Sequence, residues 1–465
     1  MFEDRAYQTK IAESALKQNT LVVLPTGLGK TAIAIKVAQE RLKFGKILIL
    51  APTRPLIAQH AESFFNALGI KGQTITGMLK PENRIYSERL IFATPQTIQH
   101  DITNGRIDLK EFSLVIFDEA HHAIGGYAYP FIARKYLEVA QNPLILALSA
   151  SPGADRQKIQ QICDNLGIKN VELRDERDSD VRPWIQPKFI EWYELELPEG
   201  FKQIRELLAK AYNKRIESLR GMGILRRKPT KRDLLALQAM LLKKKRWPLL
   251  KTVAEAIKIE HAIGLIETQS VNMFVEYMSS LGGLLREPDL LRAKWLGEQL
   301  QKSGYRHPKI AKLCEILSKN VRPDMRVIVF ANYREMVKEI VSVISHVDGI
   351  KAIEFVGQKE LRQKDQIERL KAFKEGEQNV LVATSIGEEG LDITDASLAI
   401  FYDSVPSPLR TIQRRGRVGR TQPGKIIFLI TKGTRDEAYY WSAKRKEQKM
   451  KNILYGMRSN LGKGF

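Results

Sequence analysis

The chain has 465 residues, enough for roughly three domains, and 43% of them are hydrophobic, which supports large cores. No apolar run approaches the roughly 20 residues that span a bilayer, and the first ten residues, MFEDRAYQTK, include acids and no apolar segment. We therefore expect no membrane segment and no signal peptide. Cys163 and Cys314 have no Cys or His at metal-ligand spacing, so a structural zinc site is not expected, and a reducing, cytoplasmic compartment fits best.

The net charge of +22 is distributed unevenly along the chain. Residues 201–250 hold 15 Lys/Arg against 3 Asp/Glu, and residues 441–465 hold 7 against 1. Such asymmetry favours binding to a polyanion, most simply nucleic acid, and a nucleoid-associated location. The alternative is a solvated helix face in a highly charged protein.

Residues 1–180 alternate short apolar runs with helical stretches. The runs are TLVVL, KILILA, LIFA, LVIFD and LILALS, each followed by polar or amphipathic sequence. This alternation predicts an α/β domain with a mainly parallel sheet covered by helices on both faces.

The string LPTGLGKT at 24–31 directly follows the apolar run LVVL. A strand that turns into a helix through such a loop points successive backbone N–H groups and the helix N-terminus at one phosphate. Lys30 is expected to reach the β- and γ-phosphates of ATP, and the Thr31 hydroxyl to hold Mg²⁺. The common form of this loop starts with Gly, whereas here Leu24 stands first and an extra Gly27 lies inside. The other loop residues expected to line the ATP site are Pro25, Thr26, Leu28 and Gly29.

The string FDEAHH at 117–122 follows a second apolar run, LVIF. Asp118 is placed to bind the same metal ion through water, and Glu119 to orient or deprotonate the attacking water. Taken alone, the first string is also compatible with a surface turn, and the second with a solvated acidic helix end. Together, on strands in the right order, they predict an ATPase that uses ATP and Mg²⁺.

Three further strings follow the predicted strands of this domain. APTRPL at 51–56 and ATPQTI at 93–98 repeat the pattern of strand, Thr-Pro or Pro-Thr and helix start, which binds phosphates without reading bases. SAS at 149–151 is expected to couple the two ligand sites through Ser149 and Ser151. Taken singly, each is also an ordinary strand-to-helix turn. The residues expected to contact nucleic acid here are Thr53, Arg54, Thr94 and Gln96.

The middle of the chain has a different character. Residues 181–200 are predicted to be a connector with an extended segment, and residues 201–304 a basic helical insertion. Helical spacing is clear in 201–219, breaks are expected at Pro229 and at Trp247–Pro248, and 251–281 is predicted to form one longer helix. The run Lys243, Lys244, Lys245 and Arg246 is the expected nucleic-acid grip of this insertion.

A second α/β domain is predicted for residues 305–440, followed by a basic tail at 441–465. Its apolar runs are RVIVFA, NVLVA, LAIFY and KIIFLIT. In QRRGRVGR at 413–420, Arg417 and Arg420 are spaced to reach the γ-phosphate as arginine fingers, with Gln413 one turn earlier. In VLVATSIGEEGLDI at 380–393, Thr384 and Ser385 suit a phosphate backbone. Gly390 and Asp392 of the same string are expected to line the ATP site, Asp392 at a ribose hydroxyl.

In this order the strings resemble the superfamily 2 DEAH-box helicases, and more closely the helicase part of archaeal Hef and the related FANCM translocases. The closer likeness is carried by LVVLPTGLGKT, FDEAHHA, ATPQTI, ATSIGEEGLD, QRRGR and TKGTRDEAYYWS. The ERKxxxD signature of the nuclease domain that many Hef proteins carry does not occur, so we expect no nuclease activity from this chain.

The resemblance implies two RecA-like parallel-sheet domains with a thumb-like helical insertion between them, ATP in the cleft, and 3′-to-5′ movement on forked or branched DNA. It implies that Gln8 contacts adenine and that His121 couples ATP to DNA. It also implies that Asn332, Tyr333, Gly357 and Gln358 line the DNA path.

Two other functions stay open. Related innate-immune RNA helicases share the inserted-lobe layout, so a double-stranded-RNA-activated ATPase is the alternative enzyme, because a motor that grips phosphates reads little of the 2′-hydroxyl. The third function is a scaffold that clamps junctions and closes on ATP. A clamp needs no general base, so Glu119 and the two arginines argue against it.

Overall fold

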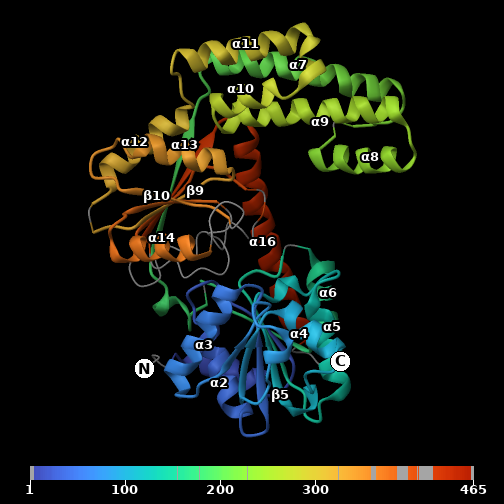
Figure 1. The fold of residues 1–465 in the computed structure, drawn as a ribbon, viewed down its shortest axis with the longest axis vertical. Helices are drawn as coiled ribbons and strands as arrows, with labels where there is room; N and C mark the ends of the chain where they lie inside the picture. Colours follow the sequence, from blue (N-terminus) through green and yellow to red (C-terminus); the bar gives the residue numbers. More distant parts are fainter. Residues whose placement is uncertain are drawn as a thin grey trace.

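The structure is a computed structural model. It describes residues 5–153, 155–176, 178–227, 229–322, 324–357, 363–384, 396–405, 407 and 423–461. Two parallel sheets form separate α/β domains, and a helical insertion lies beside the second one (Figure 1). The predicted fold class is therefore confirmed.

The first sheet has strand order β3-β4-β2-β5-β6-β1-β7, with parallel pairing throughout its described ladders. Its central strands are buried on both faces, because successive residues such as Leu21 and Val22 enter two different cores. The strands are β1 (Thr20–Val23), β2 (Lys46–Leu50), β3 (Gln73–Ile75), β4 (Leu90–Ala93), β5 (Phe112–Phe117), β6 (Ile145–Ser149) and β7 (Asn170–Leu173). The helices are α1 (Ala6–Ala15), α2 (Lys30–Arg41), α3 (Arg54–Leu68), α4 (Pro95–Thr103), α5 (Ala128–Val139) and α6 (Arg156–Leu166), with short 3₁₀ turns at Pro81–Asn83, Leu109–Glu111 and Ala120–His122.

The second sheet has strand order β10-β11-β9-β12-β13-β8, again parallel. The segment expected to be a connector supplies its edge strand, because β8 pairs along its whole length with β13. The strands are β8 (Lys188–Leu195), β9 (Val327–Phe330), β10 (Ala352–Phe355), β11 (Val380–Ala383), β12 (Leu398–Phe401) and β13 (Gly424–Thr431). The other elements here are the 3₁₀ turn Arg182–Trp184 and helices α12 (Pro308–Asn320), α13 (Arg334–Ile344) and α14 (Gln363–Glu375).

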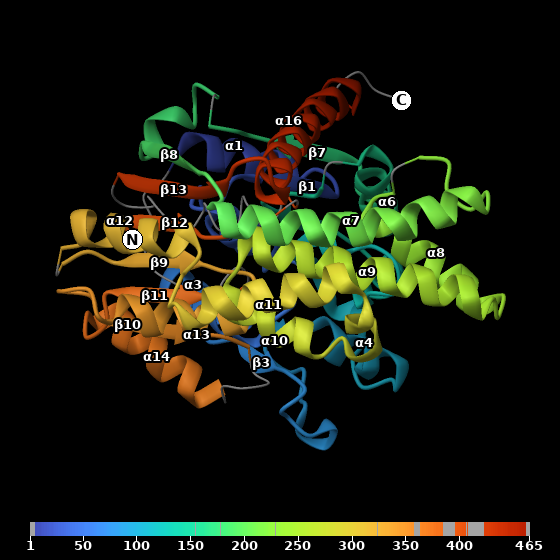
Figure 2. The ribbon, with the colours of Figure 1, turned by 90° about the horizontal axis from the view of Figure 1, so that it is seen from above.

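The insertion is helical and has its own apolar core. Figure 2 shows α7, α9 and α11 lying side by side, and their contacts agree. The elements are α7 (Glu199–Gly221), α8 (Lys231–Lys243), α9 (Trp247–Thr268), α10 (Val271–Ser279), the 3₁₀ turn Gly282–Arg286 and α11 (Pro288–Lys302). The expected break at Pro229 falls between α7 and α8, and Trp247–Pro248 begin α9 after the turn that ends α8.

The prediction of one helix over 251–281 is wrong. Helix α9 ends before Gln269, whose φ of −113° and ψ of −121° are not helical. Ser270 then caps a new helix by accepting a hydrogen bond from the Met273 N–H at 3.2 Å. No helix among the described residues is long and apolar enough to cross a bilayer.

The C-terminal helix α16 (Arg435–Leu461) joins the two α/β domains (Figure 1). It begins after β13 of the second sheet, and its residues Met450 and Leu454 are part of the core of the first domain. The segment expected to be a basic tail is therefore helical up to Leu461 and is packed through these two residues.

Candidate nucleotide and nucleic-acid sites

The carboxyl ends of the first sheet place the candidate residues in a fixed order. Along the edge, strands β4, β2, β5, β6 and β1 are consecutive neighbours. The candidate residues lie at or just beyond these strand ends: Thr94 follows β4, Thr53 lies three residues beyond β2, Asp118 follows β5, Ser149 ends β6 and Leu24 follows β1. The two threonines expected at nucleic acid thus occupy one half of the edge and the phosphate loop the other, with Asp118 and Ser149 between them.

The phosphate loop runs from β1 into α2 as its sequence predicts. Gly29 precedes the helix with φ +77°, a left-handed conformation that glycine adopts without strain. The loop is closed by two hydrogen bonds: Leu24 N–H donates to the Ser149 carbonyl at 3.2 Å, and Lys30 Nζ donates to the Leu24 carbonyl at 3.0 Å.

Helix α1 lies against this loop. Tyr7 Oη and Gln8 Nε2 both donate to the Leu28 carbonyl, at 2.7 and 3.2 Å. A Cβ at Gly29 would lie 2.3 Å from Gln8 Nε2, so the close approach needs glycine there. Gln8 thus lies against the phosphate loop.

Asp118 is a buried carboxylate held by several groups. Its Oδ2 lies 2.8 Å from His60 Nε2, and its Oδ1 accepts from the Glu119 N–H at 2.9 Å. Burial raises the pKa of Asp118, but the hydrogen bond from His60 and the charges of His60 and Lys30 outweigh it, so the net pKa is lowered. The carboxylate therefore stays charged, and because it can only accept, His60 Nε2 carries the hydrogen.

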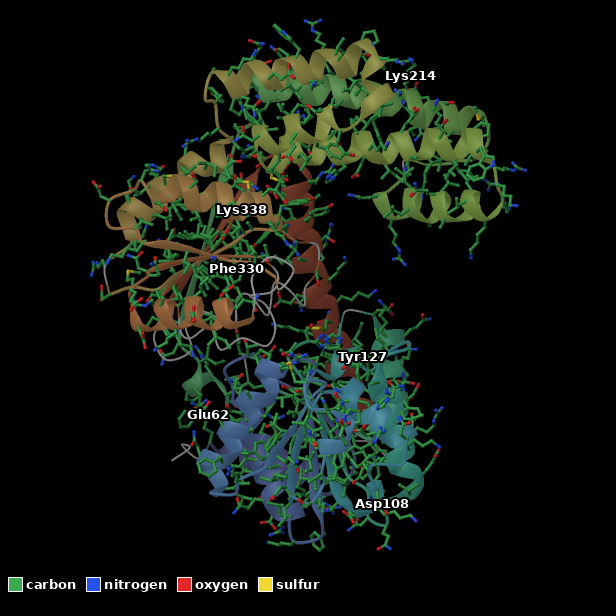
Figure 3. The ribbon with its side chains drawn as sticks, in the orientation of Figure 1. Glu62, Asp108, Tyr127, Lys214, Phe330 and Lys338 are labelled. Atoms are coloured by element: carbon green, nitrogen blue, oxygen red, sulfur yellow. The ribbon has the colours of Figure 1, made fainter. Side chains whose placement is uncertain are left out.

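Glu119 adopts a left-handed conformation with φ +49° and ψ +51°. Such backbone angles are uncommon for a residue other than glycine and cluster at functional sites. Its Oε2 lies 3.3 Å from His121 Nδ1. The ring centroids of His121 and His122 lie 4.3 Å apart, and His122 stacks on Tyr127 with centroids 5.0 Å apart. Figure 3 shows Tyr127 at the end of the first domain that faces the second.

These residues fit Mg²⁺ and ATP. A charged carboxylate at Asp118 suits a hard divalent cation, and Thr31 follows Lys30 at the start of α2 with both side chains partly exposed. Lys30, Thr31 and Asp118 would hold the ion and the phosphates. Bound Mg²⁺ would neutralise phosphate charge, which is the chemistry that phosphoryl transfer to water requires.

Ser149 and Ser151 connect the phosphate loop to the C-terminal helix. Ser151 N–H donates to Ser149 Oγ at 3.1 Å, and Ser151 Oγ lies 3.0 Å from Met450 Sδ of α16. A cavity beside this contact is lined by Pro25, Thr26, Glu447 and Lys451, among others. The sequence analysis missed α16 here, because a contact across 299 residues leaves no local pattern.

Thr53 and Thr94 both precede the first residue of a helix, at α3 and α4. Arg54 and Gln96 follow them and are exposed. Thr53 Oγ1 is buried and has no hydrogen-bond partner among the described residues, whereas Thr94 Oγ1 lies 2.8 Å from Thr97 Oγ1. An orphaned hydroxyl at a helix N-terminus suits a phosphate oxygen.

The second sheet repeats this arrangement. Its adjacent strands β10, β11 and β9 lead into Gly357, Thr384 and Asn332. Tyr333 follows Asn332 and directly precedes α13. Thr384 Oγ1 is buried without a hydrogen-bond partner in the part of the chain that is described. The predictions for Gln358, Ser385, Gly390, Asp392, Gln413, Arg417 and Arg420 lie outside the described residues.

A buried polar junction, which the sequence analysis missed, attaches the insertion to the second sheet. Asp403, just after β12, accepts from the Asn332 N–H at 2.7 Å and from Gln269 Nε2 at 2.8 Å. Lys309 is fully buried, lies 3.8 Å from Asp403 and pairs closely with Asp436. The insertion, the expected nucleic-acid strand end and the start of α16 therefore meet at one point.

Arg435 strengthens the same junction from α16. Its guanidinium donates to the Glu260 carbonyl at 2.9 Å and pairs with the carboxylates of Glu260 and Glu267 at 3.2 and 3.3 Å. A Cβ at Gly264 would lie 2.6 Å from Arg435 Nη1, so the absence of a side chain on α9 makes room for this arginine.

The run Lys243–Arg246 forms the exposed turn between α8 and α9. Lys245 has φ +52°, which marks a tight turn. The structure thus presents these four cations to solvent, as a nucleic-acid grip requires.

Comparisons with known proteins agree with this architecture. Residues 1–154 match the family model described as the res subunit of type III restriction enzymes, and residues 308–422 match the helicase conserved C-terminal domain. The crystal structure of the Pyrococcus furiosus Hef helicase domain matches with 42% sequence identity and a TM-score of 0.73, over 94% of this chain and 98% of that one.

Two curated relatives also match along the chain. One, from Methanocaldococcus jannaschii, bears the name "Putative ATP-dependent RNA helicase" and is 43% identical over 98% of this chain. Another, the ATP-dependent DNA helicase mph1 of Neurospora crassa, is 32% identical over 94% of this chain. The chain spans 61% and 41% of the lengths of these two relatives.

Two RecA-like sheets, a phosphate loop and a DEAH strand end define an ATP-using helicase of superfamily 2. Within that class the match to the P. furiosus Hef helicase domain, which covers 98% of that domain, identifies the family. The chain belongs to the Hef family of helicases.

Proposed function

We propose that this protein is an ATP-driven DNA helicase or translocase that moves 3′ to 5′ on forked or branched DNA in replication-fork repair. The order of strand ends along the first sheet supports the proposal most directly. It separates the phosphate loop from Thr53 and Thr94 and sets Asp118 and Ser149 between them. A motor needs such intermediate groups to relay the nucleotide state to the nucleic acid.

In this proposal Lys30, Thr31 and Asp118 bind Mg²⁺ and the phosphates, and Gln8 contacts adenine. Glu119 orients or deprotonates the attacking water, and its contact with His121 would report that step to the aromatic rings beside it. Gln413, Arg417 and Arg420 of the second domain would complete the site from the other side of the cleft.

Nucleic acid would lie on the helix N-termini of both sheets. Thr53 on the first sheet and Thr384 on the second each offer a buried hydroxyl that has no hydrogen-bond partner among the described residues. The basic insertion would hold the duplex part of a fork as a thumb does, and the junction at Asp403 would keep it fixed relative to Asn332.

A double-stranded-RNA-activated ATPase is the second candidate. It is favoured because the M. jannaschii relative is named as an RNA helicase. Phosphate contacts also position a duplex without testing for the 2′-hydroxyl.

The test compares ATP hydrolysis without nucleic acid and with forked DNA, matched linear duplex and an RNA fork. Strong stimulation by the DNA fork alone supports the proposal, whereas equal or greater stimulation by RNA favours the second candidate. Lys30→Ala should abolish turnover and leave nucleic-acid binding nearly intact. Turnover that survives in Lys30→Ala would refute the assigned phosphate loop.

A further inference from the structure

Trp247 is the most exposed of the five tryptophans, with 61% of its surface accessible. It is the first residue of α9 and follows the turn that contains the cationic run. In the described part of the chain, no aromatic ring, cation or side-chain hydrogen bond holds the indole. Its backbone N–H donates to the Lys245 carbonyl at 3.2 Å, which closes the turn.

The sequence before Trp247 is a run of four cations. Lys243, Lys244, Lys245 and Arg246 precede it, all exposed, and the sequence holds no Asp or Glu between Asp233 and Glu255. The left-handed φ of +52° at Lys245 is uncommon for a residue with a side chain. The turn therefore presents an aromatic face and several positive charges together.

Helix α8, which precedes this turn, also carries exposed apolar side chains. Leu235 and Leu242 are 47% and 55% exposed, and Figure 1 shows α8 on the side of the insertion turned towards the first sheet. Scattered exposed apolar residues need no explanation, but an exposed indole beside four cations has the two components of single-strand recognition. Cations track phosphates, and aromatic faces stack on bases of any sequence.

We propose that Trp247 stacks on an unpaired or terminal base at the junction of single and double strands, while Lys243–Arg246 contact the flanking phosphates. The inference rests on the proposed function, because it assumes that the insertion meets a fork. It adds a base contact to a surface otherwise expected to grip phosphates alone. Stacking would make this turn sensitive to a junction, since a continuous duplex offers no open base face.

The experiment measures binding of the whole chain, by fluorescence anisotropy at several salt concentrations, to a forked DNA and to a duplex whose ends are capped by hairpins. Trp247→Ala should weaken fork binding about 5- to 150-fold, the loss of one stacked base, and change capped-duplex binding less than about twofold. The log–log salt slope should stay unchanged, because stacking releases no counterions. Trp247→Phe should retain most of the affinity.

Trp295→Ala is the matched control, because Trp295 is 55% exposed on α11 of the same insertion. It should bind both DNAs like the wild type. A 2-aminopurine placed at the fork junction should be quenched by the wild type and by Trp295→Ala but not by Trp247→Ala.

Fork binding by Trp247→Ala equal to that of the wild type, or an equal loss on the capped duplex, would overturn the stacking site. So would tighter Trp247-dependent binding to vesicles of anionic lipid than to the fork, which would make the turn a membrane contact. Wild-type protein that binds no nucleic acid would instead refute the proposed function, and this site with it. If the fork stimulates ATP hydrolysis by the wild type, the proposed function stands, and a negative result for Trp247→Ala then refutes the stacking site alone.

Discussion

His60 Nε2 and Asp118 Oδ2 lie 2.8 Å apart, and both side chains are buried. His60 belongs to α3, the helix that starts after Thr53, whereas Asp118 directly follows β5, the strand beside β2. One hydrogen bond therefore joins the helix expected at nucleic acid to the carboxylate expected at the metal ion. The Tyr129 hydroxyl fixes the same residue from behind by donating to the Asp118 carbonyl at 2.7 Å.

Replacing His60 by Ala should lower kcat for ATP hydrolysis by roughly 10- to 100-fold, the usual effect of removing a hydrogen-bond partner of a metal-binding residue. The KM for ATP should change little, because the phosphate loop is intact. Steady-state kinetics with saturating forked DNA would measure both constants. His100→Ala is the control, since His100 lies on α4 with a largely exposed side chain, and it should leave kcat unchanged. A kcat near that of the wild type for His60→Ala would contradict this role.

Stability should fall in acid because of His307. Burial first, and then the charge of Lys309, lowers the pKa of His307 to about 3, whereas the unfolded chain titrates near the ordinary value of about 6.5. Below that value the unfolded state binds a proton that the folded state does not, so the free energy of unfolding falls as the pH falls. Between pH 6.5 and 5 the loss should reach about 2 kcal/mol.

In the wild type, the Lys309 N–H donates to His307 Nδ1 at 3.3 Å. His307→Asn removes the titrating imidazole but retains a side-chain acceptor for this N–H. Urea unfolding of both proteins at pH 7 and pH 5 should show the smaller acid loss in the variant. An equal decrease in the free energy of unfolding of both proteins would mean that other groups dominate the response to acid.

The buried junction should be sensitive to removal of its cation. Lys309→Met leaves the carboxylates of Asp403 and Asp436 buried without their lysine, which should cost about 3–5 kcal/mol of unfolding free energy. Denaturant unfolding measures this, and Lys319→Met serves as control because Lys319 forms an exposed pair with Glu315. A Lys309→Met protein as stable as the control would show that the junction is not held by this ion pair.

Neutralising Lys243, Lys244, Lys245 and Arg246 to Gln should weaken DNA binding and flatten its dependence on salt. Each lost phosphate contact should reduce the log–log slope by roughly 0.9 for duplex DNA. The control is Lys210→Gln with Lys214→Gln, because both lysines are exposed on α7 and Figure 3 shows Lys214 on the side of the insertion away from the first sheet. An unchanged slope would mean that the run at 243–246 only faces solvent.

The features predicted from sequence were those encoded within a few residues. The phosphate loop and the DEAH string follow apolar runs that are typical of buried strands, so Lys30 and Asp118 could be placed beyond strand ends of one sheet without coordinates. Both sheets and the helical insertion followed from the same alternation of apolar and polar residues.

Features held by distant partners could not be predicted in this way. The apolar pattern of 251–281 continues across Gln269, but the helix ends there, and Gln269 binds Asp403, which lies 134 residues away. His60 and Met450 carry no motif either. Each gains its role only when folding sets it beside Asp118 or Ser151.

Helix α16 also restricts how the two sheets can move. The chain leaves the first sheet near residue 174 and returns to it through α16. The two domains are therefore connected at two places, once by the chain after β7 and once by helix α16. A body joined to another at two separate points cannot translate freely. It rotates about the line through those points. Opening and closing of the ATP cleft should therefore be a swing about a single axis, with Met450 close to the pivot.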